Sequence, residues 1–222
     1  MTTAEHASRK EIVRRVETEA IVPVIRAATP DLALRAARAV LAGGISVFEI
    51  TMTVPDATEV IRALARELGD QALIGAGTVL SAAAAHQCVD AGAAFIVSPG
   101  LDADTVVEAH ARGVPAMPGA LTPTEVIAAW NLGADLVKVF PVSAVGGAPY
   151  LRALRGPLPA VKLLPTGGIT AANVGEYLAA GAAAVGVGSE LVDAKALAEG
   201  RDTVVTDRAR ALRAAVQAAR GG

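Results

Sequence analysis

The 222-residue chain has one cysteine, few aromatic residues and no long uninterrupted apolar run. Because Cys88 has no second cysteine to pair with, no disulfide can form within the chain, and its apolar helical surroundings predict a buried, unreactive thiol. Aromatic residues make up 3% of the chain against 53% hydrophobic residues, so small and aliphatic side chains must fill the interior. No stretch approaches the roughly 18 apolar residues of a membrane span, and residues 1–20 are charged. We therefore expect a cytoplasmic protein with no membrane partner.

Neither basic nor acidic residues dominate the chain, which has 20 basic and 22 acidic residues and a net charge of −2. Acidic and basic residues alternate along the expected helices and form no basic face that could follow the phosphates of DNA or RNA, so we expect no nucleic-acid partner. His6, His86 and His110 fall in helical segments without mutual ligand spacing, so we also expect no metal site.

Short apolar runs rich in valine and isoleucine recur along the chain, separated by segments of helical periodicity. Prolines at positions 30, 55 and 123 stand where three of these helices would begin. Residues 1–20 predict an additional N-terminal helix. Eight strands are expected, at Ile21–Arg26, Val47–Thr51, Ala72–Gly75, Ala94–Ser98, Pro115–Met117, Leu136–Phe140, Val161–Thr166 and Ala184–Val187.

Apolar strands that alternate with helices predict an α/β protein with a covered parallel sheet. Helix-ending glycines at 43, 92, 133 and 181 recur at intervals of about two strand–helix units, as repetition would produce. The length suits one barrel of roughly 200–250 residues, so we predict a single (β/α)₈ TIM barrel as one domain over residues 1–222. The alternative is an open doubly wound sheet. Against that alternative, the glycine-rich runs 75–80 and 186–191 both lack the third glycine of a dinucleotide-binding turn.

Lys138 is the most informative polar residue because it interrupts an apolar strand. Alternation places it on one side of the strand with Leu136 and Phe140, while Val137 and Val139 occupy the other side. The side chain therefore points into the barrel mouth or lies among the outer helices, and the two valines favour the barrel mouth. A desolvated amine can attack a ketone, which a guanidinium cannot do. The alternative is a buried lysine that only pairs with a carboxylate.

Glu49 lies in a similar strand, on the same side as Val47 and Thr51 and opposite Phe48 and Ile50. A carboxylate near the amine could transfer protons during a reaction. It could equally neutralise Lys138 or Arg26 as a salt-bridge partner, and the sequence leaves both interpretations open.

Two glycine-rich turns follow the last two expected strands, at Pro165–Ile169 and Gly186–Ser189. Barrels often bind phosphate at these two turns, where bare backbone amides can hold an anion. Short turns also use glycine for conformational reasons alone, but the presence of glycine at both turns favours a phosphate site.

Eight motifs match one known family: Val22–Arg26, Phe48–Thr51, Gly75–Val79, Ile96–Gly100, Met117–Gly119, Val137–Pro141, Pro165–Gly168 and Gly186–Ser189. On these motifs the sequence resembles the 2-keto-3-deoxy-6-phosphogluconate (KDPG) and 4-hydroxy-2-oxoglutarate (KHG) aldolases over nearly its whole length. The resemblance implies a homotrimeric barrel without a cofactor, in which Lys138 forms a Schiff base and Glu49 transfers protons. It also implies that other residues bind the substrate: Arg26, Thr78 and Pro99 in the pyruvate pocket, Phe140 beside the lysine, and Gly167, Gly168 and Ser189 at the phosphate.

The chain departs from some members of this family at Thr53, where those members have an arginine that binds the substrate carboxylate. Other members share the pattern found here, together with an arginine in the first strand, so Arg26 becomes the candidate for the carboxylate. The implied reaction is a class I aldol cleavage of KDPG to pyruvate and D-glyceraldehyde 3-phosphate in the Entner–Doudoroff pathway. The alternative substrates are 4-hydroxy-2-oxoglutarate and 2-dehydro-3-deoxy-6-phosphogalactonate.

Two other functions remain compatible with the residues taken alone. In a phosphosugar epimerase or decarboxylase barrel, Lys138 would pair with an ion or donate a proton. A catalytically silent barrel could serve as a scaffold, but it would have no need of an inward lysine, glutamate and arginine together.

Overall fold

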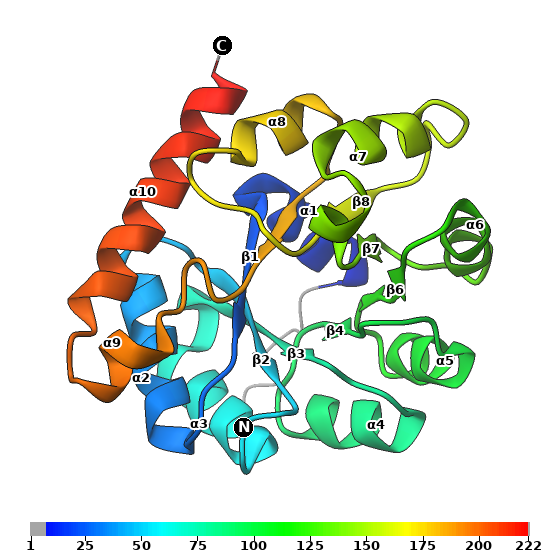
Figure 1. Cartoon of the computed structure of the whole chain (residues 1–222). Helices are drawn as coiled ribbons and strands as arrows, with labels where there is room; N and C mark the ends of the chain where they lie inside the picture. Colours follow the sequence, from blue (N-terminus) through cyan, green and yellow to red (C-terminus); the bar gives the residue numbers. More distant parts are fainter. Residues whose placement is uncertain (1–7, 222) are drawn as a thin grey trace.

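The computed structural model describes residues 8–221 and has parallel strands surrounded by helices (Figure 1). The strands are β1 Ile21–Ile25, β2 Val47–Thr51, β3 Leu73–Gly77, β4 Ile96–Val97, β5 Ala116–Met117, β6 Gly119–Ala120, β7 Val137–Val139, β8 Leu163–Pro165 and β9 Val185–Val187. The helices are α1 Arg9–Glu19, α2 Pro30–Ala42, α3 Ala57–Leu68, α4 Ala82–Asp90, α5 Ala103–Ala111, α6 Pro123–Asn131, α7 Ala148–Arg155, α8 Val174–Ala179, α9 Ala194–Ala198 and α10 Thr203–Arg220, with 3₁₀ turns at Gly69–Gln71 and Val142–Val145.

The predicted N-terminal helix is present as α1. Ser8 caps it by accepting a hydrogen bond from the backbone N–H of Glu11. Residues 1–7 of the expected helical segment, His6 among them, lie outside the described residues. Two of the proline signals also mark helix starts, because Pro30 and Pro123 are the first residues of α2 and α6.

The strands form two parallel sheets. One has the order β5-β4-β3-β2-β1-β9, and the other has the order β6-β7-β8. The expected fifth strand, Pro115–Met117, contains β5, and the additional strand β6 follows it after Pro118, which has no N–H to donate to a neighbouring strand. Its carbonyl oxygen still accepts a hydrogen bond from Lys138 N at 2.9 Å. The prediction of eight strands is therefore wrong in number, since β6 lies between the expected fifth and sixth strands.

The prediction of a closed barrel is confirmed only as an α/β fold with a curled parallel sheet. The described strands do not form one continuous closed ladder. Between β8 and β9 the backbone pairing is a single bridge, Thr166 with Gly186. Short strands at this edge leave few backbone groups to pair.

Apolar side chains form two clusters, one on each side of the curled sheet. The larger cluster lies between the strands and the outer helices, and the smaller one lies on the concave side. Three side chains of α1, Ile12, Val13 and Val16, belong to the smaller cluster, so this helix covers one end of the concave side behind the strands (Figure 1).

The clusters confirm the predicted alternation in the two strands that carry the charged residues. Val47 and Leu136 belong to the concave cluster. Phe48 and Val137 belong to the outer cluster, as do Ile50 and Val139. The strand positions of Glu49 and Lys138 therefore face the concave side.

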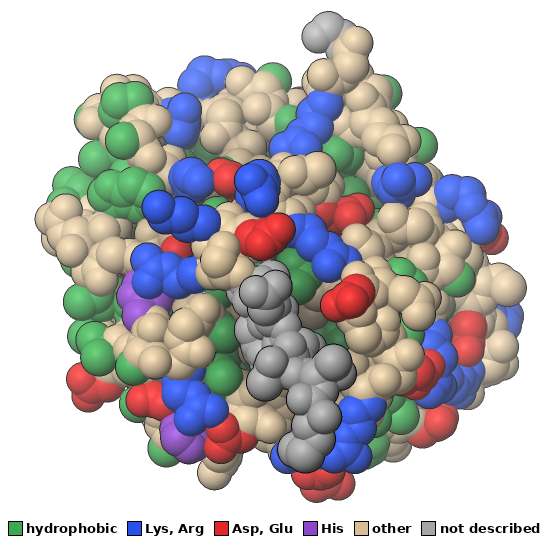
Figure 2. Space-filling model, turned by 180° about the vertical axis from the view of Figure 1, so that it is seen from behind, with side chains coloured by type: hydrophobic (Ala, Val, Ile, Leu, Met, Phe, Trp, Pro, Cys, Tyr) green, Lys and Arg blue, Asp and Glu red, His purple; other side chains and the backbone are tan. Residues whose placement is uncertain are grey.

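Cys88 is fully buried in α4, as predicted, and loss of solvation raises the pKa of its thiol to about 11. At neutral pH this side chain is a protonated, unreactive core group. No helix in residues 8–221 is long and apolar enough to cross a membrane. On the face shown in Figure 2, acidic side chains lie among the basic ones, in line with the alternation in the sequence.

Candidate active site

A cavity of about 260 Å³ opens at the carboxyl ends of the strands. Eight of the nine predicted site residues line it: Arg26, Thr78, Pro99, Lys138, Phe140, Gly167, Gly168 and Ser189. A larger groove of about 610 Å³ lies between α1 and α10, near the amino end of β2, and none of the predicted site residues lines it. We take the smaller cavity as the candidate site because the chemically informative residues meet there.

Lys138 reaches this cavity from β7. The residue is 5% exposed, and its backbone is fixed by pairing with β6 and β8. Its Nζ atom lies 3.6 Å from Glu49 Oε1 and 5.5 Å from the centroid of the Phe140 ring. The amine therefore has a carboxylate on one side and an aromatic face nearby, with access to the cavity.

Glu49 is the ninth predicted residue and does not line the cavity itself. It is 1% exposed, and within the described residues its Oε1 atom has no hydrogen-bond partner. Burial raises the pKa of this carboxyl group, while the charges of Lys138 and Arg26 act in the opposite direction. A carboxyl group with a raised pKa can both accept and donate a proton nearer neutral pH.

Gly77 at the end of β3 provides the space for the Glu49 carboxyl group. A Cβ atom on Gly77 would lie 2.6 Å from Glu49 Cδ, which is too close for any real side chain. The carboxyl group therefore packs directly against the backbone of the neighbouring strand. The motif Gly75–Val79 contains Gly77, but only the structure shows why a glycine is needed at this position.

Thr78 follows Gly77 in a left-handed backbone conformation, with φ of 59°. This conformation is unfavourable for a β-branched residue and is found mostly where a site requires it. The next residue, Val79, donates its backbone N–H to Val97 O at 3.1 Å, which fixes the turn beside the cavity.

Arg26 lies at the end of β1, is exposed, and lines the cavity. Thr53, which replaces the arginine of some family members, lies on the neighbouring turn. Its Oγ1 is 2.8 Å from Thr51 Oγ1, and Thr51 Oγ1 also donates to Ile25 O at 3.1 Å. Of the two residues, only Arg26 can supply a positive charge for a substrate carboxylate.

The turn after β8 uses two glycines in left-handed conformations, with φ of 106° at Gly167 and 71° at Gly168. Asn173 Nδ2 donates to Gly168 O at 3.0 Å and holds the turn against the start of α8. Ser189, in the turn after β9, is exposed at the same cavity. The two glycine-rich turns therefore meet at one place, as predicted.

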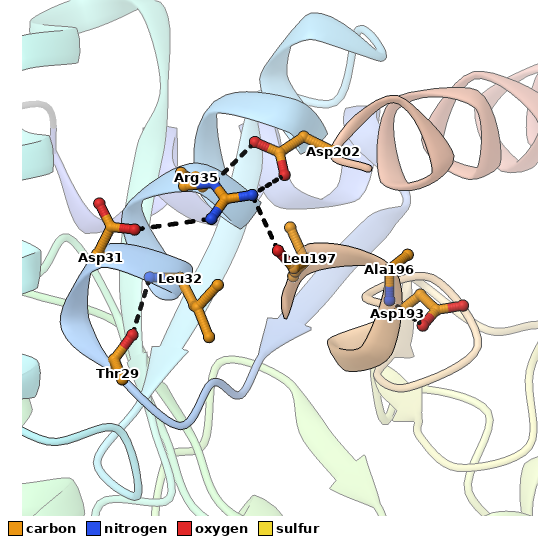
Figure 3. Close-up of polar contacts among 8 residues, drawn as sticks. All are labelled: Thr29, Asp31, Leu32, Arg35, Asp193, Ala196, Leu197 and Asp202. Carbon is orange, nitrogen blue, oxygen red and sulfur yellow. Dashed lines mark hydrogen bonds and ion pairs between the residues drawn. The ribbon is translucent and has the colours of Figure 1, made fainter. Parts of the chain in front are cut away.

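Helix α9, which follows the second turn, is fixed at both ends (Figure 3). Asp193 Oδ1 accepts a hydrogen bond from Ala196 N at 2.9 Å and caps its start. At its end, Arg35 Nη2 donates to Leu197 O at 2.9 Å, while Arg35 Nε donates to Asp202 Oδ2 at 3.0 Å. Arg35 belongs to α2, so it links the helix after β1 to the segment after the Ser189 turn (Figure 3).

Sequence reasoning did not select every residue of the cavity. The remaining lining residues are Val24, Thr166, Gly188, Glu190, Val192 and Ala194. Val24 lies in β1 and the others follow β8 or β9, a position that the sequence pattern already indicates. Glu190 is the most notable omission because it adds a negative charge next to Ser189.

The fold and the cavity define a class of protein: an α/β protein whose ligand site, at the carboxyl ends of parallel strands, contains a buried amine beside a carboxyl group. The sequence model described as "KDPG and KHG aldolase" matches residues 12–207. The chain belongs to the KDPG and KHG aldolase family, whose named members are lyases.

Two relatives and one solved structure illustrate this membership. The 2-dehydro-3-deoxy-phosphogluconate aldolase of Treponema pallidum is 38% identical over 195 residues, covering 88% of this chain and 92% of the relative. The 2-dehydro-3-deoxy-6-phosphogalactonate aldolase of Escherichia coli is 34% identical over 198 residues, covering 89% and 96%. A crystal structure of KDPG aldolase from Legionella pneumophila, with pyruvate captured as a covalent carbinolamine, superposes with a TM-score of 0.83 at 35% identity. It covers 90% of this chain and 97% of that one.

Proposed function

We propose that the protein is a class I aldolase that cleaves KDPG to pyruvate and D-glyceraldehyde 3-phosphate in the Entner–Doudoroff pathway. The observation that carries the proposal is the buried Lys138 amine, 3.6 Å from Glu49 and open to the cavity. Membership of the family and the carbinolamine captured in the Legionella pneumophila relative support it.

In the proposed mechanism, the neutral amine of Lys138 attacks the C2 ketone, and loss of water gives a protonated imine that accepts electrons. Glu49 removes the C4 hydroxyl proton, directly or through water, and the C3–C4 bond breaks. Glyceraldehyde 3-phosphate leaves, and an enamine of pyruvate stays on the lysine. Glu49 then returns a proton to C3, and hydrolysis releases pyruvate. The reaction requires no metal or organic cofactor.

The substrate is proposed to lie across the cavity with its carboxylate at Arg26 and its phosphate at the glycine-rich turns. Thr78 and Pro99 would line the pyruvate end, and Phe140 would pack beside the imine. Gly167, Gly168 and Ser189 would hold the phosphate through backbone amides and the serine hydroxyl. Their common cavity supports this assignment.

Two other substrates are second candidates for the same site. The family description includes KHG, and the Escherichia coli relative is named for the phosphogalactonate substrate. Steady-state release of pyruvate from all three 2-keto acids tests the choice. The highest kcat/KM is expected for KDPG, and absence of pyruvate from every substrate would contradict the aldolase proposal.

We also infer that the two sheets close into one eight-stranded barrel domain, with β5 and β6 as a single strand bent at Pro118. The bridge between Thr166 and Gly186 supports closure at the other edge.

We further infer that three chains associate. Three large apolar side chains from consecutive strand–helix units of the chain are exposed: Leu80 at 65%, Val107 at 59% and Ile127 at 43%. Light scattering on the eluted protein should give three times the mass of the chain, and a monomer mass would contradict this inference.

A further inference from the structure

The cavity contains one charged residue that the proposed mechanism does not use. Glu190 follows Ser189 in the turn after β9 and lines the same cavity as Lys138. It is exposed, and within residues 8–221 its side chain makes no ion pair. Its backbone oxygen accepts a hydrogen bond from Arg208 Nη1 at 3.3 Å. Glu190 therefore lines the cavity, and its carboxylate has no ion-pair partner within residues 8–221.

The turn that carries Glu190 is well fixed. The backbone N–H groups of Leu191 and Val192 donate to Gly188 O at 3.0 and 2.9 Å. Arg208 approaches the turn from α10, but its guanidinium pairs with Asp193 at 2.8 Å. The charge of Arg208 is thus already matched, and the turn keeps the negative charge of Glu190.

Positive charge in the cavity comes from the two strands that pair with β8 and β9, because Lys138 lies on β7, the partner of β8, and Arg26 follows β1, the partner of β9. Arg26 and Lys138 are the only basic residues in its lining within the described chain, and the proposed mechanism uses both at the pyruvate end. The phosphate end offers backbone amides, the Ser189 hydroxyl and the Glu190 carboxylate. A dianionic phosphate bound there meets a like charge in addition to its hydrogen-bond donors.

We propose that Glu190 is a specificity-determining residue that limits the preference for phosphorylated over unphosphorylated 2-keto-3-deoxy acids. Its charge repels a phosphate dianion, whereas a neutral terminal hydroxyl can donate a hydrogen bond to it. Both classes of 2-keto-3-deoxy acid are thereby substrates of one site. This inference rests on the proposed aldolase function and concerns the same cavity.

The test is Glu190→Gln, which removes the charge and keeps the size of the side chain. The kcat/KM for KDPG is expected to rise about tenfold, the effect of one charge on a dianion at about 6 Å in water, because repulsion is lost. The kcat/KM for unphosphorylated 2-keto-3-deoxygluconate should change by less than about twofold. The gain on KDPG should shrink as salt is raised to about 1 M, because screening weakens the repulsion in the parent protein.

Glu176→Gln is the matched control, since Glu176 is an exposed glutamate on α8 outside the cavity lining, and the change in net charge is the same. This variant should leave the ratio of the two kcat/KM values unchanged. An unchanged ratio in Glu190→Gln, or an equal change on both substrates, would overturn the Glu190 proposal.

Borohydride treatment of each variant with pyruvate separates this outcome from failure of the proposed function. An adduct on Lys138 with an unchanged substrate ratio contradicts only the role of Glu190. Absence of the adduct together with absence of turnover on both substrates contradicts the aldolase function and the Glu190 proposal with it.

Discussion

Burial has different consequences for the two charged side chains at the centre of the site. Glu49 loses nearly all contact with solvent, which raises the pKa of its carboxyl group even though Lys138 and Arg26 lower it. Lys138 remains at the cavity wall, where a substrate carbonyl can reach its amine. The pair therefore differs from a surface salt bridge, because one partner is a buried carboxyl group with a raised pKa and the other is an amine at the cavity wall.

Glu49→Gln tests whether this carboxyl group transfers protons. The substitution keeps the shape of the side chain but removes its acid–base capacity, so kcat is expected to fall by roughly 10²–10⁴-fold. Substrate binding should change much less. Steady-state kinetics on KDPG checks the prediction, and a kcat equal to that of the parent protein would show that Glu49 is only a neutralising partner.

Gly77→Ala tests the packing that positions Glu49. A Cβ atom would lie 2.6 Å from Glu49 Cδ, so the carboxyl group must leave its position beside Lys138 or the backbone must shift. We expect a loss of stability of about 1–3 kcal/mol, usual for overpacking, together with a fall in kcat of at least about tenfold. Denaturant unfolding and kinetics measure the two effects.

Gly175→Ala in α8 is the control for this change, because its Cβ atom would have an ordinary 3.6 Å contact with Ala219 Cβ. This variant should keep its activity. Full activity in Gly77→Ala would contradict the role given to Gly77.

At the scale of elements, we expect the loops after β8 and β9 to determine which group of the substrate can bind at their end of the cavity. Both loops lie at one cavity, and the segment after β9 is held by Asp193, Arg35 and Asp202 (Figure 3). Strand ends and fixed helix ends set the positions of the loop amides. Substrate selectivity should therefore respond to charge in these loops more than to changes at Lys138.

Ser189→Asp should lower kcat/KM for KDPG at least about tenfold, because a charged hydrogen bond contributes roughly 1.5–3 kcal/mol and the new carboxylate would also repel the phosphate. The kcat/KM for 4-hydroxy-2-oxoglutarate, which has no phosphate, should change much less. Measuring both substrates with the same variant decides the point. Equal losses would mean that Ser189 supports the cavity in general, and an intact preference for KDPG would locate the phosphate elsewhere.

The elements of the fold were predictable where local pattern alone determines them. Strand Val47–Thr51 has the predicted bounds, since its alternation continues to both ends. The short strand β6 was not predicted, because the expected strand ended at Met117, before Pro118, and two residues give no alternation to detect. The space that Gly77 leaves for Glu49 depends on two neighbouring strands, and no local pattern reports such a contact.

For the whole molecule, the sequence predicted which residues meet better than it predicted how the sheet closes. Strand ends in a parallel sheet share one edge, so residues at the carboxyl ends of β1, β3, β4, β7, β8 and β9 had to lie near each other. Closure depends on pairing between β8 and β9, where only a single bridge forms. Glu190 was not predicted as a site residue, because the neighbouring serine and glycines indicate an anion-binding turn, where a carboxylate is not expected.

Reductive trapping tests the central claim, which is that Lys138 forms an imine with the substrate. Treatment with borohydride and pyruvate should inactivate the protein and leave a reduced pyruvate adduct on Lys138, located by peptide mass mapping, because borohydride traps only the imine. Lys138→Arg should give neither adduct nor cleavage, because a guanidinium cannot form the imine. Lys162, whose half-exposed amine pairs with Glu17 at 2.9 Å, provides an internal comparison. An adduct on Lys162 instead of Lys138, or full activity without any adduct, would contradict the account.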